Sequence, residues 1–486
     1  MTIRLILVSL VVVAVPRGAH AFCGFFVAGS DAKLTNNASQ VVLMRKGNRT
    51  VMTMSNTYQG PPQNFAMVVP VPVVLKKQDV KTLPADVFDR VDSLSAPRLV
   101  EYWEQDPCAP PMLHTISKGA AGKRHKGEEG KMSRRADLGV TVEARFAAGE
   151  YEVVILSATE SNGLDTWLRR EKYNVPQGAA EALAPYVRDK SKFFVAKVDI
   201  KKVKRDAQGV VQLSPLRFAF DANELRLPVR LGLLNATGKQ DLIVYVIHQG
   251  ARFEVANYAN AFIPTNLEVA DGVRHNFPAF YAELFDATVE KMGRKPHPTR
   301  ADPRGGPGVV VTEYAWQTTS CDPCPTPPLA GNELMTLGAD VLGGTDDRYG
   351  PGWVLTRLHT RYSKETLSED LVFREAMPAM GGRANWNGTN GDEGANVAQQ
   401  IGGSNNFQGR YIIRHYWNGK VACEQPHFDI WGGAPGNPDA RPTPTAAKGL
   451  ATAPRGKVAL KDEVRSPVPS LGIPGKPPQR RRPTTP

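Results

Sequence analysis

The chain has 486 residues, of which 41% are hydrophobic and 22% are charged. This composition excludes a wholly disordered or fibrous chain, and the length allows two or three domains with a sizeable core. The net charge of +12 is local, because residues 436–486 carry +7, residues 114–135 carry +5 and the first 21 residues carry +2, which leaves −2 for the rest. A near-neutral body argues against a specific nucleic-acid reader, which carries its charge on a folded face.

The first 21 residues have the pattern of a secretory signal peptide. Arg4 precedes an apolar run over residues 5–15, and Ala19 and Ala21 supply the small residues of a cleavage site. The run is too short to cross a bilayer as a helix, which takes about 20 residues. We therefore expect cleavage after Ala21, a mature chain that starts at Phe22, and a periplasmic or extracellular protein without a transmembrane span.

The hydrophobic pattern predicts short strands with a few helices between them. In the first half the predicted elements are a hairpin of residues 41–44 and 51–54, a strand at 65–69 that Pro70 ends, a helix from Pro84 to Val91 with a further turn at 98–103, a hairpin of 140–146 and 151–156, helices at 163–172 and 177–189, and a strand at 193–200. The second half adds strands at 216–220, 226–234, 241–248 and 251–257, a helix capped by Asn276, a strand at 308–316, a helix at 331–341, and strands at 353–362 and 409–417. This mixed order predicts an α+β fold with mostly antiparallel sheets built from hairpins and a few packed helices.

Composition divides the chain into segments. We expect a signal peptide at 1–21, an N-terminal β-rich subdomain at 22–113, a flexible basic insert at 114–136, a central α+β subdomain at 137–300, a C-terminal subdomain at 301–435 that contains the Cys-x-x-Cys motif and a Gly/Asn-rich loop at 378–409, and a disordered basic, Pro-rich tail at 436–486. The tail has few large apolar residues, and these recur with no regular period, so its removal is expected to leave the melting temperature nearly unchanged. Its charge predicts weak binding to anionic surfaces.

Several of these stretches resemble a bacterial family. They are Cys23 to Asp31, Phe65 to Pro72, Gly149 to Leu156, Tyr173 to Pro176, Leu225 to Gly232, Ile263 to Asn266 and Cys321 to Cys324. In this order they are similar to the domain-of-unknown-function (DUF) 2330 family, over roughly residues 22–375. The resemblance implies an exported bacterial protein and implies no activity.

No pattern of a known catalytic or metal site is present. The sequence has no G-x-S-x-G elbow, no H-E-x-x-H zinc motif, no phosphate-binding loop and no G-x-G-x-x-G. Asp346 and Asp347 beside glycines are read as a turn in preference to a cation site, because the spacing of a calcium loop is missing. We therefore predict no catalytic residue, no metal and no cofactor.

The five cysteines are Cys23, Cys108, Cys321, Cys324 and Cys423. Exported cysteines oxidise, so we expect Cys321 and Cys324 to be in disulfides, with each other or with Cys108 and Cys423, while one cysteine stays unpaired or pairs between chains. A thioredoxin-type site is disfavoured, because three prolines within residues 325–328 prevent the helix that would lower a thiol pKa. A zinc site would need two further ligands.

The Gly/Asn-rich loop holds a possible ligand contact. Trp386 lies between Asn385 and Asn387, an arrangement that can stack on a sugar ring, although the same Trp can instead anchor the loop. The sequence favours a non-catalytic exported envelope protein, a binding or structural module with an unidentified envelope partner. The alternatives are a hydrolase acting on extracytoplasmic polymer and a thiol-redox protein.

Overall fold

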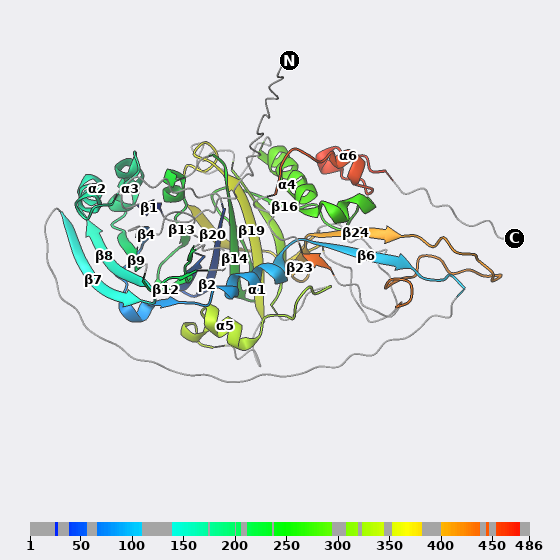
Figure 1. The fold of residues 1–486 in the computed structure, drawn as a ribbon, viewed down its shortest axis with the longest axis horizontal. Coiled ribbons are helices and arrows are strands. Elements are labelled where there is room, and N and C mark those ends of the chain that lie inside the picture. Colours follow the sequence, from blue (N-terminus) through cyan, green and yellow to red (C-terminus); the bar gives the residue numbers. More distant parts are fainter. Residues whose placement is uncertain are drawn as a thin grey trace, which may run out of the picture.

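A computed structural model gives the fold of the chain (Figure 1). The structure describes residues 25–27, 38–55, 66–108, 139–173, 175–199, 201–205, 211–235, 238–293, 308–318, 323–344, 352–381, 400–437, 444–446 and 453–476. The predicted signal peptide, the whole predicted basic insert, Asp346 and Asp347 lie outside these residues.

Short strands dominate the described residues. The strands are β1 (Phe25–Val27), β2 (Ala38–Lys46), β3 (Arg49–Met54), β4 (Ala66–Val71), β5 (Val80–Thr82), β6 (Arg98–Glu104), β7 (Val140–Ala148), β8 (Tyr151–Ala158), β9 (Lys192–Val198), β10 (Lys204–Arg205), β11 (Val211–Gln212), β12 (Leu216–Asp221), β13 (Leu225–Leu227), β14 (Gln240–Gln249), β15 (Arg252–Val255), β16 (Ala259–Phe262), β17 (Leu267–Glu268), β18 (Val309–Gln317), β19 (Trp353–Tyr362), β20 (Leu371–Ala376), β21 (Ala379–Met380), β22 (Gln400–Ile401), β23 (Asn406–Gln408), β24 (Arg410–His415), β25 (Trp431–Gly432) and β26 (Thr445–Ala446). The α-helices are α1 (Asp86–Ser95), α2 (Ser161–Arg170), α3 (Ala179–Arg188), α4 (Phe277–Gly293), α5 (Gly331–Leu337) and α6 (Leu460–Glu463), and the 3-10 helices are η1 (Lys77–Asp79), η2 (Arg230–Asn235), η3 (Asp271–His275), η4 (Ala339–Val341) and η6 (Pro469–Leu471).

A large mixed sheet forms the centre of the molecule. Its strand order is β22-β21-β23-β18-β19-β14-β2-β3-β12-β5, and β16 pairs with β18. The predicted hairpin is β2 and β3, which turn at Gly47 with a positive φ of 58° that glycine adopts without strain. Strand β2 runs parallel to β14, and both are buried on their two faces, so their sequences read as continuous apolar runs.

Both faces of the large sheet are covered (Figure 1). On one face, Leu43 and Val244 join a core shared with the antiparallel sheet β1-β4-β9-β8-β7, whose far side carries α2 and α3. On the other face, Val42 and Tyr245 pack under α1 and α5. Helix α4 covers the same face further along, where it also packs on β24. The predicted apolar stripe of α4 is confirmed as core, with Phe280 only 1% exposed.

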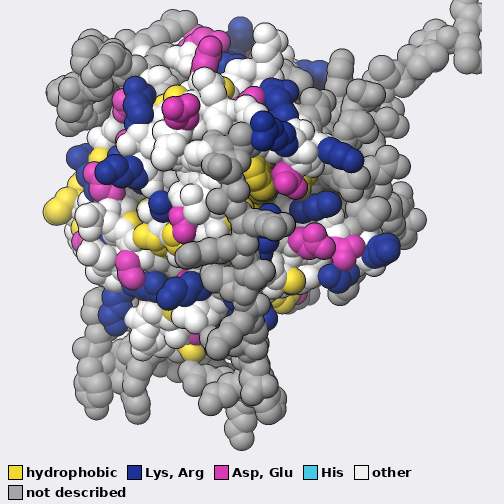
Figure 2. Space-filling view, turned by 90° about the vertical axis from the view of Figure 1, so that its left-hand side faces the viewer, with side chains coloured by type: hydrophobic (Ala, Val, Ile, Leu, Met, Phe, Trp, Pro, Cys, Tyr) yellow, Lys and Arg dark blue, Asp and Glu magenta, His cyan; other side chains and the backbone are white. Residues whose placement is uncertain are grey.

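The described architecture confirms the predicted α+β class with mostly antiparallel sheets and a few packed helices. Figure 2 shows the end of the molecule that carries α2 and α3, where Lys and Arg side chains are interspersed with Asp and Glu. This face therefore carries no large patch of one charge sign, in agreement with a near-neutral body.

Four local predictions are wrong. Residues 98–103 are a strand and not a helical turn, because they pair along β24 from Arg98 opposite Arg410. Strand β4 runs through Pro70 to Val71, where Pro70 lies opposite Phe193 of β9; among the described residues, β1 pairs with β4 only as far as Val68. The strand at 226–234 ends at Leu227 and continues as η2, and the Gly/Asn-rich loop begins and ends with short strands of the large sheet.

The prediction of a disordered tail is also wrong, over residues 444–446 and 453–476. Strand β26 pairs with β6, and residues 453–476 contain α6 and η6. Val464 is 0% exposed, Val468 is 4% exposed and Ile473 is 8% exposed, all within the core of α4. Three apolar side chains without a regular period thus hold the segment, because they pack against apolar residues of the body in the core of α4.

Candidate functional site

A cleft opens between the beginnings of α1 and α4. It encloses about 690 Å³. Its walls are α1, the start of α4 with the preceding Arg274, the loop after Cys324, and the tail at β26; the lining residues are Asp86, Asp89, Arg90, Ser93, Arg274, Phe277, Pro278, Pro325, Thr326, Pro444 and Thr445. A concave surface with a few polar groups over an apolar base is the usual form of a ligand site.

The two arginines of the cleft already have acidic partners. The Nε of Arg90 donates to Glu333 Oε1 at 2.6 Å, and its Nη2 donates to the carbonyl of Pro327 at 3.1 Å. The Nη2 of Arg274 donates to Glu101 Oε2 at 2.7 Å. The arginine charges are therefore balanced inside the protein, while Asp86 and Asp89 on α1 are exposed.

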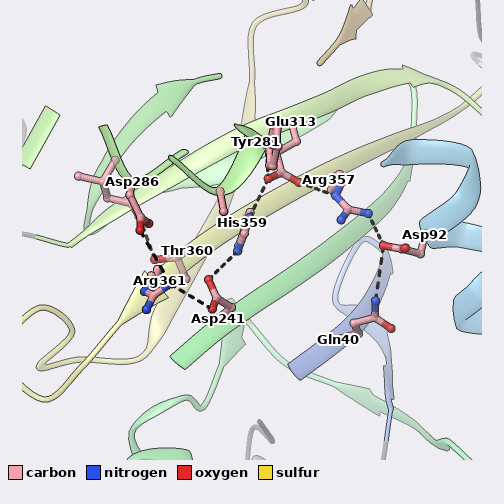
Figure 3. A network of polar contacts seen from close by, with 12 residues as sticks. Gln40, Asp92, Asp241, Tyr281, Asp286, Glu313, Arg357, His359, Thr360 and Arg361 are labelled. Atoms are coloured by element: carbon pink, nitrogen blue, oxygen red, sulfur yellow. Dashed lines mark hydrogen bonds and ion pairs between the residues drawn. The ribbon is translucent and has the colours of Figure 1, made fainter. Parts of the chain in front are cut away.

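A buried polar network lies beneath the same two helices (Figure 3). His359 donates from Nδ1 to Glu313 Oε1 at 2.7 Å and from Nε2 to Asp241 Oδ1 at 3.1 Å. Arg357 donates from Nε to Glu313 Oε2 at 2.5 Å. The side chains of Glu313, Arg357 and His359 are at most 1% exposed. The network therefore holds charges away from water, where pairing decides whether they are tolerated.

Strand geometry explains why these groups meet. Arg357, His359 and Arg361 alternate along β19, so they share one face of the sheet. On β18, Thr312 lies opposite Leu358 and Tyr314 lies opposite Arg357, so Glu313 between them is the extra residue of a β-bulge. Glu313 shares the face of Val311, which lies opposite His359, and the extra residue brings Tyr314 opposite Arg357.

The charges fix the protonation states of the network. Burial alone would lower the pKa of His359, but the carboxylate of Glu313 and the hydrogen bonds to Asp241 and Glu313 raise it to about 9. Burial alone would raise the pKa of Glu313, but His359 and Arg357 lower it to about 2. Burial raises the pKa of Tyr281 well above its ordinary value, so its hydroxyl stays a donor to Glu313 Oε1 at 2.5 Å.

The network links α1 to α4 across the sheet. On one side, Arg357 Nη1 donates to Asp92 Oδ1 of α1 at 2.5 Å, and the Tyr245 hydroxyl donates to the same oxygen at 2.7 Å. On the other side, the ring of His359 stacks on Phe285 of α4 with centroids 4.0 Å apart. The network therefore joins both covering helices to the large sheet.

This arrangement does not suit nucleophilic catalysis. A general base needs a free imidazole nitrogen within reach of a hydroxyl or thiol. Both nitrogens of His359 are occupied by carboxylates, and the raised pKa keeps the ring protonated at neutral pH. Among the described residues, no group of three or more His, Cys, Asp or Glu side chains is arranged to hold a metal ion.

One disulfide joins distant parts of the chain. Cys108 follows β6, and Cys423 lies 315 residues later in the loop between β24 and β25, with Cα atoms 5.6 Å apart. The sequence does not determine which cysteines pair, and the structure pairs Cys108 with Cys423. Cys324 is disulfide-bonded too, and residues 323–330 after the motif contain no helix. Cys23 and Cys321 lie outside the described residues.

The ligand contact predicted from the sequence is not among the described residues of the cleft and the buried network. Asn385, Trp386 and Asn387 lie outside the described residues, so the sugar-stacking reading stays a prediction. The network was missed because its histidine has no metal-type spacing. The signal that would have found it is the charged residues at alternate positions of a strand, Arg357, His359 and Arg361, within an otherwise apolar stretch.

Fold and site define an α+β protein with a large mixed sheet, a buried ionic network and an open cleft. Residues 17–374 match the family described as "Uncharacterized protein conserved in bacteria (DUF2330)". The chain belongs to this family, which confirms the resemblance seen in the sequence. Neither a curated protein nor a solved structure matches the chain. In the described part of the chain no helix is both long and apolar enough to cross a bilayer.

Proposed function

We propose that this chain is an exported, non-catalytic envelope protein that serves as a binding or structural module. The observation that carries the proposal is the disulfide between Cys108 and Cys423. Structural disulfides persist in oxidising compartments and are rare in the reducing cytosol. The signal-peptide pattern of residues 1–21 supports the same compartment.

The buried network supports the non-catalytic half of the proposal. A protonated His359 held between Glu313 and Asp241 contributes to stability and offers no base to a substrate. The chemistry of the network suits the stabilisation of the packing of α1 and α4 on the large sheet.

Export is tested with a reporter fusion. Residues 1–30 are fused to a phosphatase that folds only outside the cytoplasm, and we expect active reporter from bacterial cells. The matched control carries Leu10→Arg, which interrupts the apolar run near its centre and should abolish the signal. Equal reporter activity from both fusions, or none from either, contradicts export by this segment.

We propose the cleft as the contact surface for the envelope partner. A photo-cross-linking amino acid at Ser93, which lines the cleft, should capture a defined partner in intact cells. The same amino acid at exposed Lys172, just after α2, is the control and should capture none. Identical capture from both positions contradicts a partner in the cleft. Binding of anionic surfaces by Arg480 to Arg482 stays a proposal, since these residues lie outside the described ones.

A hydrolase acting on extracytoplasmic polymer is the second candidate. The observation that favours it is the pair Asp86 and Asp89, which lie three residues apart on α1 and line the cleft together. Paired carboxylates serve as acid and base in glycoside hydrolysis. If this candidate holds, Asp86→Asn and Asp89→Asn each abolish release of soluble sugar from envelope polymer; no release by the unaltered protein rejects it.

A further inference from the structure

The C-terminal segment of residues 453–476, called the strap below, is held on the body at two places. The first is Arg455, whose Nη1 donates to Asp286 of α4 and whose Nη2 donates to Asp241 Oδ1 of β14 at 3.2 Å. The Nη1 also lies 3.4 Å from the carbonyl oxygen of Ala282. Two carboxylates and a carbonyl thus surround one guanidinium group, and charge-assisted bonds of this kind are the strong ones.

The carboxylates belong to the body and to the network already described. Asp241 also accepts from His359, and Arg361 Nη1 lies 3.8 Å from Asp241 Oδ2 and 3.9 Å from Asp286 Oδ2. The Asp241 side chain is 4% exposed, whereas that of Asp286 is 35% exposed. The pocket therefore opens to the surface at Asp286 and ends at Asp241.

The second attachment is apolar, with little backbone pairing. Val464 forms a single bridge with Val269, and the neighbouring backbone bonds go to Glu268 and Ala270. Val464 and Val468 insert into the core beside α4. A single bridge is not a strand ladder, so lifting the strap breaks few backbone hydrogen bonds and leaves the strands of the body paired.

The strap lies beyond the part of the chain that matches the family. The match ends at residue 374, so Asp241 and Asp286 lie within it and Arg455 does not. The body thus carries a guanidinium pocket that this chain fills from a separate C-terminal segment.

We propose that the strap is a releasable tethered ligand, and that the pocket of Asp241 and Asp286 with the adjoining apolar surface beside α4 is a binding site for an arginine-bearing peptide segment. In the closed state the strap occupies this site in cis. In the released state a segment of the same chemistry binds in trans. The inference goes beyond the proposed function and does not depend on export, since it concerns a contact within the folded chain.

The test uses the full chain with a specific protease site placed within residues 447–452. The folded protein is cut, its circular dichroism is compared before and after, and a fluorescent synthetic peptide of residues 453–476 is added. We expect an unchanged spectrum and exchange of the cut strap for the peptide, seen as fluorescence co-eluting with the body. An uncut sample is the control and should bind much less peptide, because the tethered strap competes at a high effective concentration.

Peptide variants test the pocket itself. A peptide with Arg455→Ala should bind about 10- to 100-fold more weakly, because two carboxylates each lose one of their cationic partners. A peptide with Arg465→Ala is the matched control: it loses the same charge, and Arg465 contacts the body through its backbone N–H. Equal weakening by both variants, absence of exchange, or loss of the folded spectrum on cutting would each overturn the proposal.

Discussion

Glu313 is the position where a single substitution tests the buried network most sharply. Its carboxylate is 0% exposed and accepts from Arg357, His359 and Tyr281. Glu313→Gln keeps the volume of the side chain and removes its negative charge, which leaves two buried cations with one carboxylate fewer. Breaking a buried pair from one side costs about 3–5 kcal/mol. This is a large part of the stability of a domain, which is about 5–15 kcal/mol.

The measurement is the free energy of unfolding from a urea titration followed by circular dichroism. The matched control is Glu375→Gln, which removes a carboxylate that lies 3.6 Å from His248 but is 65% exposed. An exposed pair contributes about 0–1 kcal/mol, so the control should stay close to the unaltered protein. A loss below about 1 kcal/mol for Glu313→Gln, or equal losses for both variants, would refute the view that the network is dry and paired.

Three further predictions follow from the structure. Folding raises the pKa of His359 from 6.5 to about 9, so its contribution to stability is complete below about pH 6.5 and is lost as the pH rises toward 9. His359→Gln should therefore flatten the decline of the unfolding free energy between these pH values. An equally steep decline in the variant contradicts the pairing. Val464→Ala should cost about 2 kcal/mol in a urea titration, whereas Val341→Ala, at a side chain 36% exposed, should cost little; equal effects would mean that the tail does not pack. Under non-reducing conditions, Cys108→Ser should lower the unfolding free energy by about 2–4 kcal/mol relative to the unaltered protein. Under reducing conditions, where the unaltered protein also lacks this bond, the two proteins should have the same unfolding free energy. A difference that persists under reducing conditions would point to another cause.

Local patterns in the sequence predict most of the elements. The hairpin of β2 and β3 and the helix α4 follow from turn residues and apolar periodicity, which are properties of neighbouring residues. Residues 98–103 show the limit: their pattern allows a helical turn, and only the pairing with β24, far along the chain, makes them a strand.

The candidate site depends on such long-range pairing. Glu313, His359 and Asp241 lie on three different strands, and no local pattern in the sequence tells which strands pair. The prediction for the tail is wrong for a related reason, because composition describes the segment alone and not the apolar residues of the body against which Val464 packs. The compartment stays a prediction, since it depends on the sequence pattern of residues 1–21, which lie outside the described residues.

The most direct test of the proposed function is mass spectrometry of the unreduced protein isolated from its native cell envelope. The account predicts an N-terminus at Phe22 and a peptide pair linked through Cys108 and Cys423. A chain that keeps Met1 and carries both of these cysteines as free thiols would contradict it.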